Sequence, residues 1–202
     1  MYAQLNTKTV FSFMDATVKL TDYITAAKTL GYQTLGISDV DNLHAAHQFI
    51  TQAKAAGIQP VIGYETTLLL DGLAINFTFI AKTNAGLQNL YSISSKKNFG
   101  YNNFSDIHSH LCDVALILPA DSAVDSILTH LPQNDVFVGL AQPMAQGFLR
   151  PTIPFLSVRY LNAGDAETLA ILHHVKNGTK YDDSLTSNHF ESLRLESEVR
   201  AL

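Results

Sequence analysis

Residues 34–67, TLGISDVDNLHAAHQFITQAKAAGIQPVIGYETT, hold two apolar runs with an amphipathic stretch between them. The runs at 34–38 and 59–67 are short and apolar, which is typical of strands that are buried on both faces of a sheet. Between them, 42–56 has apolar residues at helical spacing, starts at a capping Asn or Asp and stops at Gly57. The stretch therefore predicts a strand, a helix and another strand.

The same alternation continues along the chain. Further strands are expected at 2–7, 75–81, 114–118, 135–139 and 154–158, and further helices at 19–30, 85–96, 105–112, 122–131 and 165–175. Seven strands alternating with helices predict a parallel sheet, either closed into a barrel or open and doubly wound. In both cases the chemistry would lie at the carboxyl ends of the strands. The residues expected there are Thr7, Lys8, Asp39, Val40, Glu65, Lys82, Asp121 and Arg159.

The composition indicates one compact domain. The chain has 202 residues, of which 47% are hydrophobic and 15% are charged, and its net charge is −5. This balance argues against disorder, and the sequence has no basic stripe of the kind that follows a nucleic-acid backbone. Residues 1–202 are therefore expected to form a single domain. The final stretch, FESLRLESEVRAL, is an amphipathic pattern without a stop signal, so we expect the chain to be a fragment of a longer protein.

The sequence also predicts a cytoplasmic location. Its single cysteine, Cys112, excludes an internal disulfide and fits a reducing compartment, where it is expected to be a small buried side chain. The amino-terminal residues lack the charged and apolar regions of a signal peptide. No apolar stretch reaches the roughly 18 residues that would span a membrane.

Other patterns give little support to a different enzyme. The sequence has no Gly-x-Ser-x-Gly motif of a serine hydrolase and no glycine-rich phosphate loop. His108 and His110 fall in a predicted helix, where residues two apart point in different directions, which argues against a metal-binding pair. Asp41 and Asn42 are interpreted as helix-capping groups rather than metal ligands.

Four stretches of the chain resemble one known family. They are AQLNTKTVFSFMDA (3–16), the block at 26–65, FTFIAKTNAGLQNLYSISS (77–95) and PFLSVRYLNAGDAETLAILHHVKNGT (154–179). Together they are similar to the polymerase-and-histidinol-phosphatase (PHP) domain at the amino terminus of bacterial DNA polymerase III alpha subunits, and most of all to the short subunits of Gram-positive bacteria. The resemblance covers nearly the whole chain, and residues 30–94 are its most specific part.

The resemblance implies a fold and a parent protein. The fold of the family is an α/β, distorted seven-stranded, TIM-like barrel, which agrees with the strand count above. The parent would be a DNA-directed DNA polymerase acting in DNA replication, with this chain as its amino-terminal module. Its expected partners are the remaining domains of the alpha subunit, other replisome subunits, and DNA through the parent protein, with no membrane involved.

The resemblance also implies where a metal site would lie. Members of the family that bind zinc or manganese hold the ions with His, Asp, Glu and Cys side chains at strand ends. The carboxylates Asp15, Asp39 and Glu65 match such positions, and Asp121 matches one that is often Cys, through a looser alignment. At the other matched positions, where the family has histidines and one aspartate, this chain has Asn6, Lys8, Val40, Asn76, Ser157 and Arg159.

This exchange changes the electrostatics of the matched positions. Lys8 and Arg159 would repel divalent cations and could neutralise the remaining carboxylates. We therefore expect a degenerate site with no catalytic residues and no metal cofactor, in which Lys8 and Arg159 pair with some of Asp15, Asp39 and Glu65. The predicted function is a non-catalytic structural module of the polymerase. The alternatives are a metal-dependent phosphoesterase or 3′–5′ exonuclease, and a free-standing amino-acid-pathway phosphatase on the same fold.

Overall fold

The computed structural model describes residues 3–120, 124–132, 134–141 and 147–179. Each strand and helix predicted from the sequence has a counterpart there, although several boundaries differ. Within the described residues, no helix is both long enough and apolar enough to cross a membrane. In chain order the elements are β1 (Asn6–Thr7), α1 (Leu20–Thr29), β2 (Thr34–Val40), α2 (Ala46–Ala55), β3 (Gln59–Leu70), β4 (Leu73–Ala81), α3 (Asn84–Asn98), α4 (Phe104–Ile107), the 3₁₀ turn η1 (His108–His110), β5 (Val114–Pro119), α5 (Val124–Leu128), β6 (Val136–Leu140), β7 (Thr152–Pro154), β8 (Ser157–Val158) and α6 (Ala163–Asn177).

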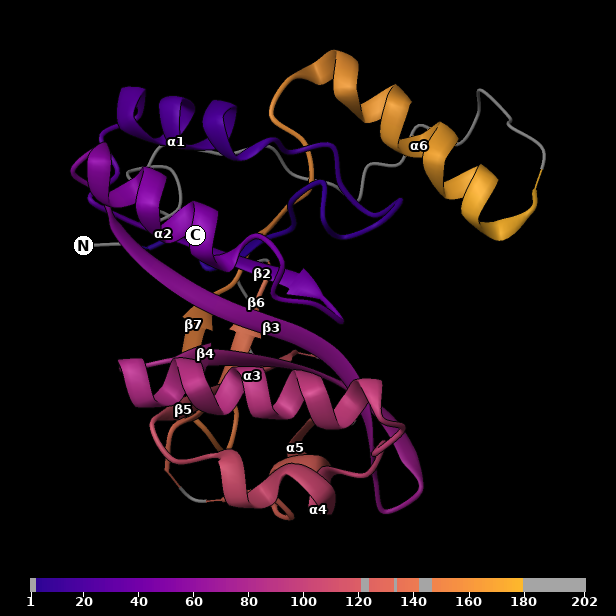
Figure 1. Cartoon of the computed structure of the whole chain (residues 1–202). Helices are drawn as coiled ribbons and strands as arrows, with labels where there is room; N and C mark the ends of the chain where they lie inside the picture. Colours follow the sequence, from indigo (N-terminus) through magenta and orange to yellow (C-terminus); the bar gives the residue numbers. More distant parts are fainter. Residues whose placement is uncertain (1–2, 121–123, 133, 142–146, 180–202) are drawn as a thin grey trace.

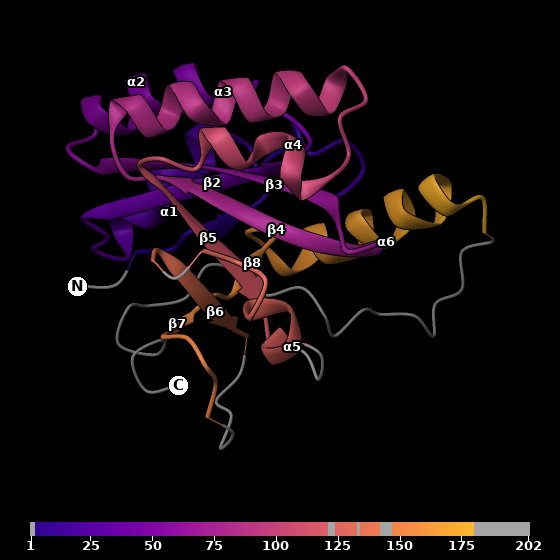
Figure 2. The ribbon, with the colours of Figure 1, turned by 90° about the horizontal axis from the view of Figure 1, so that it is seen from below.

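Six strands form one curled sheet in the order β2-β3-β4-β5-β6-β7 (Figures 1 and 2). Strands β1 and β8 pair with each other in parallel, with Asn6 opposite Ser157. An isolated parallel bridge between Gln4 and Leu35 connects the amino-terminal segment to β2. Helices α2 and α3 lie along the outer face of the curled sheet, as Figure 2 shows.

The sheet is mixed, which corrects the prediction of an all-parallel sheet. Strand β4 runs antiparallel to both β3 and β5. The cause is a two-residue connection, Asp71-Gly72, in which both residues have positive φ angles of 50° and 81°. Such Asp-Gly turns join antiparallel strands into hairpins. Because β4 is reversed, Lys82 at its end lies away from the carboxyl ends of the parallel strands, and it pairs with Asp135 next to the start of β6.

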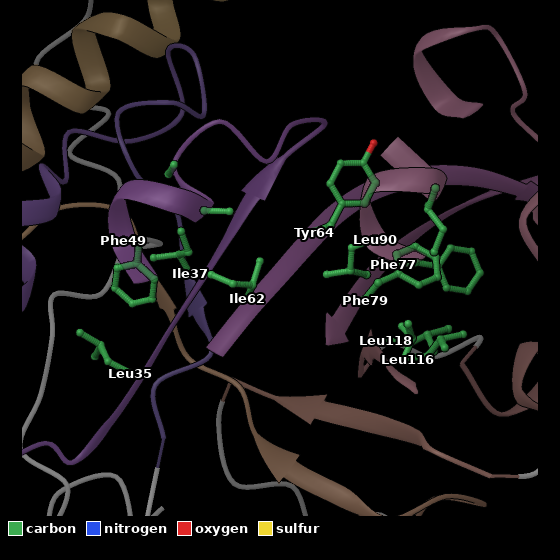
Figure 3. Packing of buried hydrophobic residues seen from close by; sticks show 14 of the residues in the cluster. Leu35, Ile37, Phe49, Ile62, Tyr64, Phe77, Phe79, Leu90, Leu116 and Leu118 are labelled. Atoms are coloured by element: carbon green, nitrogen blue, oxygen red, sulfur yellow. The ribbon is translucent and has the colours of Figure 1, made fainter. Parts of the chain in front are cut away.

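The main hydrophobic core lies between the sheet and its outer helices. Figure 3 shows Tyr64, Phe77 and Phe79 from β3 and β4 packed near Leu90 of α3, and all four side chains are buried. Gly86 allows α3 to approach the sheet, because a Cβ atom at this position would overlap the backbone oxygen of Asp113.

Three further expectations need correction. Helix α2 begins at Ala46 rather than at residue 42, because Asp41 has a φ of 56° and the side chain of Asn42 bonds to the backbone oxygens of Phe11 and Val40. The strand expected at 154–158 is interrupted, so β7 and β8 are separate. Cys112 is exposed rather than buried.

Candidate functional site

Lys8 lies directly after β1, and its side chain is fully buried. Its ammonium group lies 2.7 Å from Glu65 Oε2 and donates hydrogen bonds to Asn6 Oδ1 at 2.7 Å and Ser38 Oγ at 2.9 Å. Asn6, Ser38 and Glu65 come from β1, β2 and β3. Three neighbouring strands therefore converge on one cation, and the ion pair expected between Lys8 and a carboxylate is formed with Glu65.

Burial and attraction act on this pair in opposite directions. Burial lowers the pKa of Lys8 below its ordinary 10.5, although the charge and hydrogen bond of Glu65 oppose that change. For Glu65, burial favours a higher pKa, but the ammonium of Lys8 outweighs it and holds the pKa below the ordinary 4.5. Asn76 and Thr78 of β4 add hydrogen bonds to the Glu65 carboxylate at 3.2 and 3.4 Å. The carboxylate is thus stabilised in its ionised form.

Asp39 is held by hydrogen bonds instead of a cation. Its carboxylate accepts bonds from the backbone N–H of Thr9 at 2.6 Å, from the Thr9 hydroxyl at 2.8 Å and from the Ser12 hydroxyl at 2.7 Å. The Ser12 hydroxyl also accepts a bond from the backbone N–H of Val40 at 3.0 Å. Asp39 therefore fixes the loop after β1, and the apolar side chain of Val40 offers no atom that could bind a metal.

Asp15 forms a second charged cluster, which joins the loop after β1 to α6. Lys176 lies 2.7 Å from Asp15 Oδ2, and His173 Nε2 lies 3.4 Å from Oδ1. Arg159 lies 4.0 Å from the same Oδ1 and donates a 3.2 Å hydrogen bond to the backbone oxygen of Asp15. The expected pairing of Arg159 with a carboxylate is therefore present, but as a weaker contact than that of Lys8.

A pocket of about 500 Å³ opens beside the buried pair. Half of the ten matched positions meet there, since Asn6, Glu65, Asn76, Ser157 and Arg159 all line it. Asp15 and Asp39 are not among its lining residues, and Asp121 lies outside the described part of the chain. The lining is completed by Thr78, Pro119, Ala120, Gly139, Ala141 and Phe155.

Several residues of these networks were missed by the sequence analysis. Ser38, Thr9 and Ser12 supply hydroxyl groups, and single hydroxyl residues carry no distinguishing pattern. His173 and Lys176 reach Asp15 from more than 150 positions away in the chain, so no local spacing relates them. Of the ten positions that the sequence did identify, eight belong to the stretches quoted for the family resemblance, while Asn76 directly precedes one of them and Asp121 lies outside them.

The metal ions implied by the resemblance do not fit these side chains. Metal–oxygen bonds of about 2.0–2.6 Å would use the same lone pairs that accept hydrogen bonds from Lys8. Its positive charge would also repel a divalent cation in this buried position. Among the described residues, no group of three or more His, Cys, Asp or Glu side chains is placed to hold a metal ion.

Comparison with known proteins identifies the family. Residues 4–143 match the PHP domain. The chain is 36% identical to the DNA polymerase III subunit alpha of Streptococcus pyogenes over 88% of its own length, and 31% identical to that of Staphylococcus epidermidis over 96%. It spans only 17% and 19% of the length of these relatives.

Among solved structures, an amidohydrolase from Chromobacterium violaceum is 11% identical, with a TM-score of 0.47 over 100% of this chain and 96% of that one. The match over residues 4–143 covers well over half of the sequence and includes the whole of β1 to β6. The chain therefore belongs to the PHP domain family.

Proposed function

We propose that this chain is a non-catalytic structural module of a bacterial DNA polymerase III alpha subunit, and that residues 1–202 are part of that longer protein. The two relatives support this placement, because the chain matches a segment of each over most of its own length. Its partners would be the remaining domains of the subunit, through which it would contribute to DNA replication.

The observation that carries the non-catalytic assignment is the content of the pocket. A metal-dependent phosphoesterase needs side chains that hold cations and activate water. Here Asn6, Asn76 and Ser157 offer neutral oxygens, while Lys8 neutralises Glu65. Asn6, Lys8, Asp15, Asp39, Val40, Glu65, Asn76, Asp121, Ser157 and Arg159 would then be the vestiges of a metal site, now without catalytic or metal-binding roles.

We also infer that the curled sheet closes into a distorted seven-stranded barrel. Residues 152–158 run from β7, which pairs with β6, into β8, which pairs with β1. The Gln4–Leu35 bridge continues this pairing to β2. If β7 and β8 count as one interrupted strand, the two edges of the six-stranded sheet are joined through β1.

A combined metal and nuclease measurement tests the assignment. The chain, purified without chelator and then exposed to zinc and manganese, is expected to retain less than about 0.1 equivalent of metal. With either ion it should release no nucleotides from the 3′ end of single-stranded DNA and no phosphate from a phosphomonoester. Stoichiometric metal together with turnover would contradict the non-catalytic assignment and favour the exonuclease or phosphoesterase alternative.

A further inference from the structure

The ammonium group of Lys8 has as many acceptors as it has protons. An ammonium carries three N–H donors. Three oxygens, from Asn6, Ser38 and Glu65, lie 2.7, 2.9 and 2.7 Å from the nitrogen. These are the lengths of charge-assisted hydrogen bonds. A fully buried charge is tolerated when it is paired and hydrogen-bonded in this way, because it cannot be compensated by water.

Strand β1, which Lys8 follows, and its partner β8 have little backbone pairing of their own. Strands β1 and β8 are two residues long, and β1 approaches β2 through the Gln4–Leu35 bridge. Lys8 adds contacts from β1 to β8 on one side and to β2 and β3 on the other. Its backbone N–H donates to the oxygen of Val158 at 2.9 Å, while its side chain reaches β2 and β3. One residue therefore connects four strands where the backbone pairing is shortest.

We propose that the Lys8 ammonium is a structural cation built into the chain, which ties β1, β2 and β3 together and makes this end of the sheet independent of a bound metal. A metal ion that joins several strands contributes its binding free energy to folding. The Lys8 ammonium can join strands in the same way, but it is part of the chain and does not have to bind from solution. The proposal concerns the stability of this chain and does not depend on its proposed place in a polymerase.

The role of Lys8 can be tested by shortening its side chain to alanine and then adding a small amine that could replace the missing part. Lys8→Ala removes three methylene groups and the ammonium, which together have the shape of propylammonium. Because loss of one partner leaves a buried charge uncompensated, the Tm of the variant is expected to fall by roughly 10 °C. Propylammonium should raise this Tm in a concentration-dependent manner by mass action, and it should not raise that of the wild type.

Two controls separate charge from space filling. Propan-1-ol has nearly the same shape without the charge, so it should not restore the Tm of Lys8→Ala. Lys82→Ala removes a lysine whose partner, Asp135, lies at 2.9 Å, but both side chains are 42% exposed. This variant should lose little stability and gain nothing from propylammonium. The wild type should keep its Tm in the presence of EDTA.

A second pair of variants covers the case in which Lys8→Ala does not fold. Lys8→Met fills most of the space but leaves Glu65 unpaired, so adding Glu65→Gln to it should raise the Tm. The proposal is overturned if Lys8→Ala unfolds within about 2 °C of the wild type, or if propan-1-ol restores it as well as propylammonium. It is equally overturned if EDTA lowers the Tm of the wild type, or if Glu65→Gln fails to raise that of Lys8→Met.

Discussion

Lys8 and Glu65 are opposite charges in a part of the molecule that water barely reaches, with exposed fractions of 0% and 8%. Moving two such charges out of water costs free energy, so their attraction need not produce net stability. The loss of one partner is different, because the remaining charge stays buried. The contribution of the pair to the free energy of unfolding should therefore depend on whether Glu65 is protonated.

The pKa of Glu65 is held below 4.5 in the folded chain, mainly by Lys8, against the effect of burial. The unfolded chain therefore protonates Glu65 at a higher pH, and the contribution to stability is complete above about pH 4.5 and lost as the pH falls through the folded pKa. Glu65→Gln should lower the free energy of unfolding by about 3 kcal/mol at pH 7. Urea unfolding from pH 7 to pH 3 should show this difference shrinking below about pH 4.5.

A surface pair provides the comparison for this pH series. Asp135→Asn breaks the contact with Lys82, which is half-exposed, and should cost less than about 1 kcal/mol. A loss for Glu65→Gln that is the same at pH 7 and pH 3 would contradict the assigned direction of the Glu65 pKa.

The sequence identified both members of the buried pair because each lies within a recognisable family stretch, although Glu65 lies inside β3 and not at the strand end where it was expected. It did not identify Ser38, although the Ser38 hydroxyl completes the contacts of Lys8. A serine within a strand has no spacing or charge that indicates its partner. Contacts between side chains 30 positions apart depend on the register of the strands, which a single sequence does not specify.

At the scale of the elements, the hairpin between β3 and β4 explains why the predicted direction of β4 was wrong. The positions of β3 and β4 were predicted well, but their relative direction was not. Asp71-Gly72 is a recognisable hairpin signal, and its two positive φ angles reverse the chain at once. The alternation of strands and helices does not reveal such a two-residue turn, and the predicted all-parallel sheet is wrong at β4 for that reason.

Helix α6 contacts the loop after β1 through the cluster around Asp15. Asp15 contacts Lys176 and His173 of the helix and Arg159 just before it. Asp15→Asn should therefore increase hydrogen exchange over residues 163–177 while lowering the free energy of unfolding by only about 1 kcal/mol, because the cluster is partly exposed. Mass spectrometry of the exchanged peptides measures both the extent and the location of the change.

Glu167→Gln is the matched control for α6, since Glu167 is an exposed acidic residue on the same helix. It should leave the exchange of α6 unchanged. Equal exchange in Asp15→Asn and the wild type would mean that apolar contacts, such as those of the buried Leu169, hold the helix without the charged cluster.

At the scale of the whole molecule, the proposed closure of the barrel depends on the short segment between β7 and β8. Phe155 lies in this segment, and its backbone N–H donates to the oxygen of Leu140 in β6 at 2.8 Å. Its ring packs with Ile80, Ala115 and Ile117 in a small second core. A Cβ atom on Gly139 would come within 2.8 Å of this ring, so the two positions are closely fitted.

Phe155→Ala should therefore destabilise both neighbours of the segment together. Removal of a buried ring, here 8% exposed, is expected to cost about 3 kcal/mol. If residues 152–158 join β6 to β1, hydrogen exchange should rise in both of these strands. Phe13→Ala, at a side chain that is 77% exposed, should change the free energy of unfolding by less than about 0.5 kcal/mol. Increased exchange confined to β6 and β7 would show that β1 and β8 are held independently, and the sheet would then be an open one.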